Sequence, residues 1–127
     1  MKLRSDLSRV LGLGSARSGS HHWVHQRLSA IALMPLSLWF VTALLTHMHD
    51  DAVDLANWIR SPFVTVLLVG LIGAMFYHAK LGLQVVIEDY VHAEFAKIGL
   101  LITVKLGCAL GALLGIVAVL KISFGMT

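Results

Sequence analysis

Three long apolar stretches, separated by short polar segments, dominate this chain of 127 residues. They run from about Leu28 to Thr46, Pro62 to Ile87 and Ile98 to Phe124. Each is long enough to cross a hydrocarbon layer of about 30 Å as an α-helix rising about 1.5 Å per residue. Charged residues make up only 13% of the chain, which is typical of an integral membrane protein. The sequence therefore predicts an all-α membrane domain with three transmembrane helices, covering residues 1–127 as one unit.

The basic residues are distributed unevenly about these stretches. One side of the membrane would carry six of them, namely Lys2, Arg4, Arg9, Arg17, Arg27 and Lys97, whereas the other would carry only Arg60 and Lys121. Cytoplasmic segments are enriched in Lys and Arg. We therefore predict a cytoplasmic N-terminus, a periplasmic C-terminus and a cytoplasmic connection over residues 88–97. The same bias explains the net charge of +3 without a nucleic-acid partner.

Local signals refine this outline. Apolar residues at helical spacing within Met1–Leu11, interspersed with basic ones, predict a short interfacial amphipathic helix. Pro35 predicts a kink in the first span, and Pro62 suits the first turn of the second. In the third span, Gly107, Gly111 and Gly115 form a ridge of small residues at which another helix can approach closely.

An ionisable ring, His78, lies near the middle of the second apolar stretch. Such a side chain is costly in hydrocarbon and usually faces the interior of a helix bundle. Gly82, Val85 and Asp89 follow on the same helix face, so that Gly82 leaves a flat slot beside the imidazole. Imidazole is a standard axial ligand of haem iron, and a planar macrocycle would fit such a slot. From position alone, a histidine hydrogen-bonded to a neighbouring helix is the more ordinary interpretation, and both stay open.

A haem with two histidine ligands would need its second ligand from another chain. His92 lies 14 residues after His78, roughly 21 Å along an ideal helix, which is too far for one macrocycle. The second stretch also carries a separate polar stripe of Lys80, Gln84 and Glu88, spaced four residues apart. Lys80 points about 200° from His78 around the helix, so we expect it outside the slot. It would snorkel or contact another subunit.

Asp89 and Tyr90 follow the second stretch and end the helix predicted there. A tyrosine at this depth is ordinarily an interfacial anchor. With an acidic neighbour it could instead donate a hydrogen bond to a quinone carbonyl and connect it to protons from water.

Polar residues also cluster before the first span. Arg27, together with a nearby histidine, could hold the carboxylates of a membrane cofactor. Metal sites are conceivable at His21, His22 and His25 and at His47-Met48-His49-Asp50, but both patterns are weak.

The run His78-Ala79-Lys80-Leu81-Gly82-Leu83-Gln84-Val85, continuing to Asp89-Tyr90-Val91, resembles the small membrane-anchor subunit (the D subunit) of succinate dehydrogenase. The Gly14–Gly19 start and the His–Arg pair before the first span resemble the alphaproteobacterial and mitochondrial-like form of that family. The resemblance covers about residues 11–92, whereas the third span is similar only in its general character and not in specific motifs.

This resemblance implies three transmembrane helices that pack with a second membrane-anchor subunit (the C subunit) and share one haem b with it. It implies that His78 is an axial iron ligand, that His21 and Arg27 lie near the haem propionates, and that Tyr90 and Asp89 belong to a ubiquinone-reduction site. FAD and iron–sulfur clusters would reside on two further subunits, the flavoprotein and the iron–sulfur subunit, where succinate is oxidised. The chain would tether them to the bacterial inner membrane.

Other interpretations stay open at this level. A fumarate reductase anchor without haem is disfavoured by the central His78. A small transport subunit would place His78 and Lys80 on a proton path and carry no chromophore. A structural scaffold or assembly factor would show no redox phenotype when His78 is replaced.

Overall fold

The computed structural model describes residues 16–126, which form four helices and no strand. The long helices are α2 (Ala16–His47), α4 (Pro62–Tyr90) and α5 (Glu94–Ser123), and each is long and apolar enough to cross a membrane. The short helix α3 (Ala52–Ile59) lies between α2 and α4. The prediction of three long apolar helices is confirmed. The predicted amphipathic helix at Met1–Leu11 falls outside the described residues.

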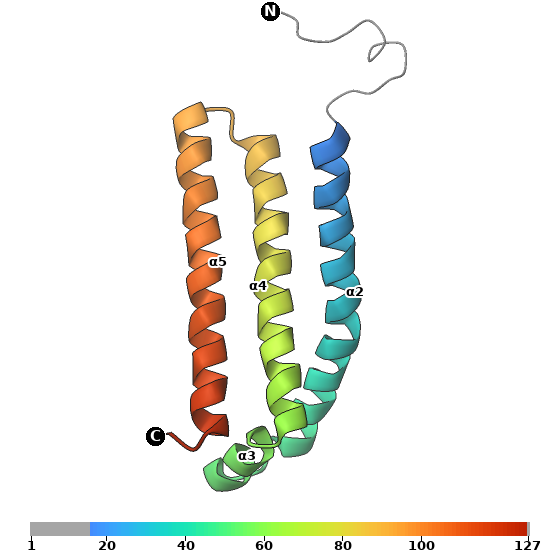
Figure 1. Ribbon diagram of the computed structural model, residues 1–127, viewed down its shortest axis with the longest axis vertical. Coiled ribbons are helices and arrows are strands. Elements are labelled where there is room, and N and C mark those ends of the chain that lie inside the picture. The colour runs from blue at the N-terminus through green and yellow to red at the C-terminus, as the bar shows by residue number, and fades with distance from the viewer. Residues whose placement is uncertain (1–15, 127) are drawn as a thin grey trace, which may run out of the picture.

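The three long helices stand side by side in a single layer, with α4 in the middle (Figure 1). The buried apolar side chains of the described residues all belong to α4, where they contact helices on two sides; they are Val64, Leu68, Leu71, Leu81 and Ile87. Most large apolar residues elsewhere are exposed. A single layer of helices leaves two broad apolar faces that lipid or other subunits must cover.

Helix boundaries extend beyond the apolar stretches. Residues 16–27 belong to α2, and α5 begins at Glu94, so the connection after α4 covers only residues 91–93 rather than 88–97. A helix can continue into the interfacial zone because its backbone hydrogen bonds are satisfied within the helix, and Glu94 suits a helix N-terminus. His92 therefore lies in this connection and not on the face of α4 that carries His78.

The proline predictions have separate outcomes. Pro62 occupies the first turn of α4, as expected. Pro35 lies inside α2, which remains one continuous helix and bends in its lower half (Figure 1). Proline removes one backbone hydrogen bond and crowds the preceding turn, which accounts for a bend at this level.

Helix α3 was not predicted. It begins where the Asp51 carboxylate accepts hydrogen bonds from the backbone amides of Val53 (2.9 Å) and Asp54 (2.8 Å). Aspartate is among the best residues at this capping position, because its oxygen satisfies amides that lack a helical partner. Asp51 followed by Asp54 was the available sequence signal. Near the C-terminal end of α3, the centroid of the Trp58 ring lies 6.1 Å from that of the Trp39 ring. This stacking holds α3 against α2.

The glycine ridge of α5 packs against α4. A Cβ atom at Gly111 would lie 2.5 Å from a ring carbon of Phe76, and one at Gly115 would lie 3.1 Å from Ile72 Cγ2. Gly107, by contrast, has open space around it. The helix that approaches the ridge is therefore α4 of the same chain, and only two of the three glycines take part.

Candidate functional site

His78 lies on the side of α4 that faces α2, half-buried between the two helices. Its Nδ1 atom is 2.9 Å from the Ser29 hydroxyl, which is buried in α2. Ser29 also lies 3.0 Å from the Gln26 carbonyl oxygen, to which it donates its hydrogen bond. A serine hydroxyl carries a single proton. With the Ser29 proton directed to the Gln26 carbonyl, His78 would donate through Nδ1–H to the Ser29 oxygen.

In that arrangement the imidazole is the Nδ1–H tautomer. With the proton on Nδ1, the Nε2 atom of neutral His78 carries a lone pair, and Nε2 has no partner among residues 19–126. Histidines that bind metals almost always donate their other ring N–H to a fixed oxygen, which sets both tautomer and ring orientation. The donor set therefore fits an axial ligand of haem iron. The hydrogen bond to a neighbouring helix, one of the two interpretations of His78, is present, and the ligand role stays a prediction.

Gly82 faces the Gln26 side chain of α2, and the approach of that helix does not require a glycine at this position. A Cβ atom here would lie 3.7 Å from the Gln26 Nε2 atom, an ordinary van der Waals distance. Two buried polar atoms nearby on α2, His22 Nε2 and Gln26 Oε1, lack a hydrogen-bond partner within the described part of the chain. Buried polar atoms are rarely left unpaired in complete structures. This side of α2 is therefore incomplete in the isolated chain.

The polar residues near the N-terminal end of α2 lie in two different environments. His21 and His25 face Tyr77, whose hydroxyl forms a hydrogen bond with His25 Nδ1. A shallow cavity of about 200 Å³ lies there, lined by His21, His22, His25, Tyr77 and Leu81. Arg27 instead stacks on Trp23, with its guanidinium carbon 5.1 Å from the ring centroid.

The structure does not bring His21 and Arg27 together. Six residues on a helix place two side chains about 120° apart, so the two lie on different sides of α2. No group of three or more His, Cys, Asp or Glu residues suited to a metal ion occurs in the portion of the chain that is described.

Asp89 and Tyr90 occupy the last turn of α4, and both are exposed. The Tyr90 side chain is 78% exposed. A binding site for a hydrophobic ligand buries most of the ligand surface, so these two residues can supply only part of one. At the opposite end of the bundle, the His47 imidazole contacts Asp50 at 2.5 Å. This pair belongs to the polar turn before α3.

Sequence reasoning missed two polar residues that organise the region. Ser29 follows Arg27 by two positions, and a hydroxyl inside an apolar span commonly hydrogen-bonds across to another helix. That was the available signal. For Tyr77 there was none, because its partner His25 lies 52 positions away and the pairing depends on how α2 and α4 are rotated against each other.

Three apolar helices, a histidine within one of them that is hydrogen-bonded to its neighbour, and two open apolar faces are the features of a membrane subunit. The succinate dehydrogenase/fumarate reductase transmembrane subunit model matches residues 1–118. The chain belongs to this family. No solved structure matches it significantly.

Relatives cover nearly the whole chain. It is 39% identical over 117 residues to the succinate dehydrogenase hydrophobic membrane anchor subunit of Rickettsia bellii (strain RML369-C). The aligned region covers 91% of this chain and 93% of the relative. The corresponding subunit of Rickettsia conorii is 37% identical over 83% of this chain and 84% of its own length. The succinate dehydrogenase membrane anchor subunit of Reclinomonas americana is 34% identical over 71% and 78%, respectively.

Proposed function

We propose that this chain is the small membrane-anchor subunit of a succinate:ubiquinone oxidoreductase in the bacterial inner membrane, with His78 as one axial ligand of a haem b. The observation that carries the proposal is the oriented imidazole. His78 Nδ1 is bonded to Ser29, which leaves Nε2 unpaired inside a membrane-spanning helix. An unsatisfied polar nitrogen in hydrocarbon is costly, and coordination to iron would satisfy it.

The second axial ligand and the far wall of the haem site would come from a second membrane-anchor subunit. Among the described residues, His78 is the only histidine near mid-membrane depth, and the helices form one layer with open faces. The unpaired His22 and Gln26 atoms mark the side of α2 that such a partner or its cofactor would complete. When bound, the haem supplies a one-electron redox centre within the membrane.

The propionates of that haem would be held at the cytoplasmic end of α2. His21 lines the cavity beside Tyr77 and can donate a hydrogen bond there. Arg27 offers the planar, bidentate donor set that carboxylates prefer. It could act there only if its side chain left Trp23 and reached around α2.

Ubiquinone would be reduced near the cytoplasmic end of α4. Tyr90 donates a hydrogen bond to a quinone carbonyl in this proposal, and Asp89 accepts protons from water and passes them toward the same oxygen. Because Tyr90 is largely exposed, other subunits must complete the site. The flavoprotein and iron–sulfur subunits, which carry FAD and the iron–sulfur clusters, would oxidise succinate and dock on this cytoplasmic side.

Replacement of the ligand tests the proposal. The complex containing His78→Ala is purified, and haem is quantified per flavin together with the reduced-minus-oxidised spectrum. We expect loss or strong depletion of haem b. The matched control is His92→Ala, a histidine in the connection after α4, which should keep full haem content. Unchanged haem content and spectrum in His78→Ala would refute the assignment.

A further inference from the structure

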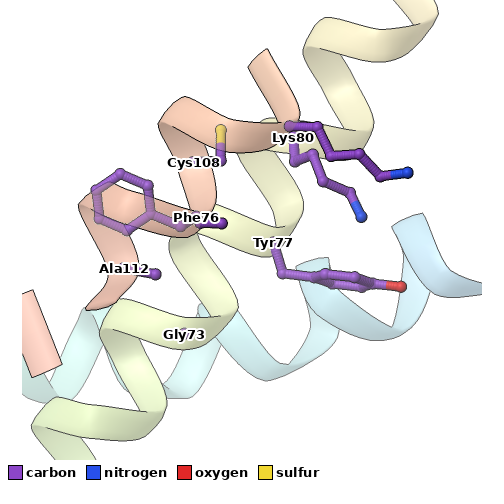
Figure 2. A pocket seen from close by; sticks show the side chains of 8 residues that line it. Gly73, Phe76, Tyr77, Lys80, Cys108 and Ala112 are labelled. Carbon is purple, nitrogen blue, oxygen red and sulfur yellow. The ribbon is translucent and has the colours of Figure 1, made fainter. Parts of the chain in front are cut away.

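A groove between α4 and α5 has no role in the proposed function. It encloses about 270 Å³, and Lys80 of α4 and Lys105 of α5 both line it. Figure 2 shows Lys80 and Tyr77 extending to the same side of this groove. Apart from Tyr77, the other lining residues are apolar and mostly small, namely Gly73, Phe76, Cys108, Ala109 and Ala112. Two basic side chains therefore border an apolar groove.

Both lysines lie well inside the membrane. Helix α4 has 29 residues, about 43 Å, so it extends roughly 7 Å beyond each side of a hydrocarbon core of about 30 Å. Lys80 precedes the end of α4 by ten residues, and Lys105 follows the start of α5 by eleven. Their Cα atoms thus lie roughly 8 to 10 Å inside the core.

The Lys80 side chain extends deeper still. Its ammonium lies 5.0 Å from the centre of the Tyr77 ring, and Tyr77 is one turn closer to the middle of α4. Lys80 therefore does not reach for the nearer membrane interface, as a snorkelling lysine would. Charged groups at such a depth are costly and almost always pair with another charged or polar group.

Neither lysine has a carboxylate partner within residues 19–126. The ion pair found in that part of the chain joins His47 and Asp50 at the other end of the bundle. Glu88, two turns after Lys80 on α4, accepts a hydrogen bond from Gln84 instead. An aromatic ring attracts an ammonium group without neutralising its charge. The described residues therefore offer no counter-charge to either lysine.

A second copy of this chain could not supply the missing counter-charge. All seven acidic residues lie outside the three apolar stretches; they are Asp6, Asp50, Asp51, Asp54, Glu88, Asp89 and Glu94. A further copy would bring only the same lysines to this depth, and like charges repel strongly in surroundings of low dielectric constant. The counter-charge must therefore come from a different molecule.

The groove lies on a different side of α4 from the proposed haem site. Lys80 follows His78 by two residues, which is about 200° around the helix. His78 meets Ser29 of α2, whereas Lys80 lines the groove beside α5. A partner of the lysines therefore approaches this chain from another direction than the haem.

We propose that the α4–α5 groove binds a transmembrane helix of a different subunit, which carries one aspartate or glutamate at the depth of the lysines. Small residues such as Gly73, Ala109 and Ala112 let a helix approach closely. The acidic side chain accepts hydrogen bonds from the ammonium groups of Lys80 and Lys105, so that the two surfaces are complementary in charge. A lipid phosphate cannot take this place, because head groups lie outside the hydrocarbon core. The proposal does not depend on haem binding or on the quinone site.

The test uses membrane vesicles that contain the assembled complex. They are treated with dicyclohexylcarbodiimide, an apolar reagent that activates carboxyl groups inside the membrane. A lysine amine in contact with an activated carboxyl group forms an amide with it, and dicyclohexylurea leaves. Peptide mass spectrometry should find Lys80 or Lys105 joined to an aspartate or glutamate of a different polypeptide. Acylurea adducts on other carboxyl groups in the same digest show that the reagent entered the membrane.

A charge-removing variant measures what the contact contributes. The complex containing Lys80→Gln/Lys105→Gln is purified through a tag on this chain, and the co-purifying subunits are quantified as detergent is increased. The subunit identified by cross-linking should be held roughly thirty-fold more weakly, because its carboxylate would be left unpaired in apolar surroundings. Lys121→Gln, which removes a lysine from the last turn of α5, is the matched control and should retain that subunit fully.

Three results would each overturn the proposal. One is the absence of any cross-link from Lys80 or Lys105 to another polypeptide in vesicles that the reagent has entered. Another is a cross-link only to a haem propionate or to an acidic residue of this chain's own sequence. The third is equal retention of every subunit in wild type and in the double-lysine variant. The cross-link is read in the unmodified chain, so this experiment and the His78 experiment can fail independently.

Discussion

Replacement of Gly111 by alanine tests whether the glycine ridge of α5 holds that helix against α4. The new Cβ atom would lie 2.5 and 2.8 Å from two carbons at the tip of the Phe76 ring. Ordinary carbon–carbon contacts are about 3.5 to 4.0 Å. The ring must therefore turn away, or the two helices must separate by about 1 Å.

The expected cost follows from these contacts. A side chain forced about 30° from its rotamer costs about 0.5 to 1.5 kcal/mol, and overpacking of a tight contact costs about 1 to 3 kcal/mol. Alanine also favours the helix over glycine by about 1 kcal/mol. Gly107→Ala has the same helix-propensity gain without a clash, because nothing lies near its Cβ position. The two variants should thus differ by about 1 to 3 kcal/mol.

The measurement is the thermal midpoint of the intact complex, read by size-exclusion chromatography after heating. The expected order of stability is Gly107→Ala, then Gly115→Ala, then Gly111→Ala, since a Cβ atom at Gly115 approaches Ile72 only to 3.1 Å. Phe76→Leu should reduce the effect of Gly111→Ala in the double variant, because the clashing ring is gone. Equal midpoints for Gly107→Ala and Gly111→Ala would refute the packing argument.

Three further predictions concern hydrogen bonds. Ser29→Ala should weaken haem retention by about 10- to 100-fold, as other losses of a ligand-orienting partner do; Ser29→Thr should restore it, and equal haem content in both would contradict the role given to the hydroxyl that meets His78. Tyr90→Phe should lower ubiquinone reduction about five- to tenfold, the worth of one hydrogen bond, while succinate oxidation with an artificial acceptor persists; equal loss of both activities would argue against a quinone contact. Asp51→Ala should destabilise α3 by about 1 kcal/mol, seen as faster amide hydrogen exchange there, whereas Asp50→Ala should leave that exchange unchanged.

Some features depend only on residues that are close in the sequence, and they could be predicted from the sequence alone. The length and polarity of the three spans follow from the thickness of the bilayer and from the cost of exposing charge to it. The start of α4 at Pro62 follows from the fixed φ of proline. A histidine at mid-span stands out because few ionisable residues are tolerated at that depth.

Other features depend on how the helices are rotated and placed against one another. The periodicity around His78 indicated a helix face but not that Ser29 lies opposite it. The glycine ridge indicated a close approach, and the structure shows that the approaching helix is α4 and that Gly107 is not involved. Lys80 and Lys105 lie 25 positions apart in sequence and line one groove only because α4 and α5 are antiparallel.

The sequence by itself therefore determined a membrane subunit of three helices with an ionisable group in its middle, because hydropathy and helical rise are properties of one segment at a time. Only the tertiary structure decided which nitrogen of His78 faces Ser29, which glycines form a helix contact and which two lysines line one groove. Those outcomes depend on atoms of different helices lying within a few ångströms of each other, and this proximity is set by the packing of α2 and α5 on the two sides of α4.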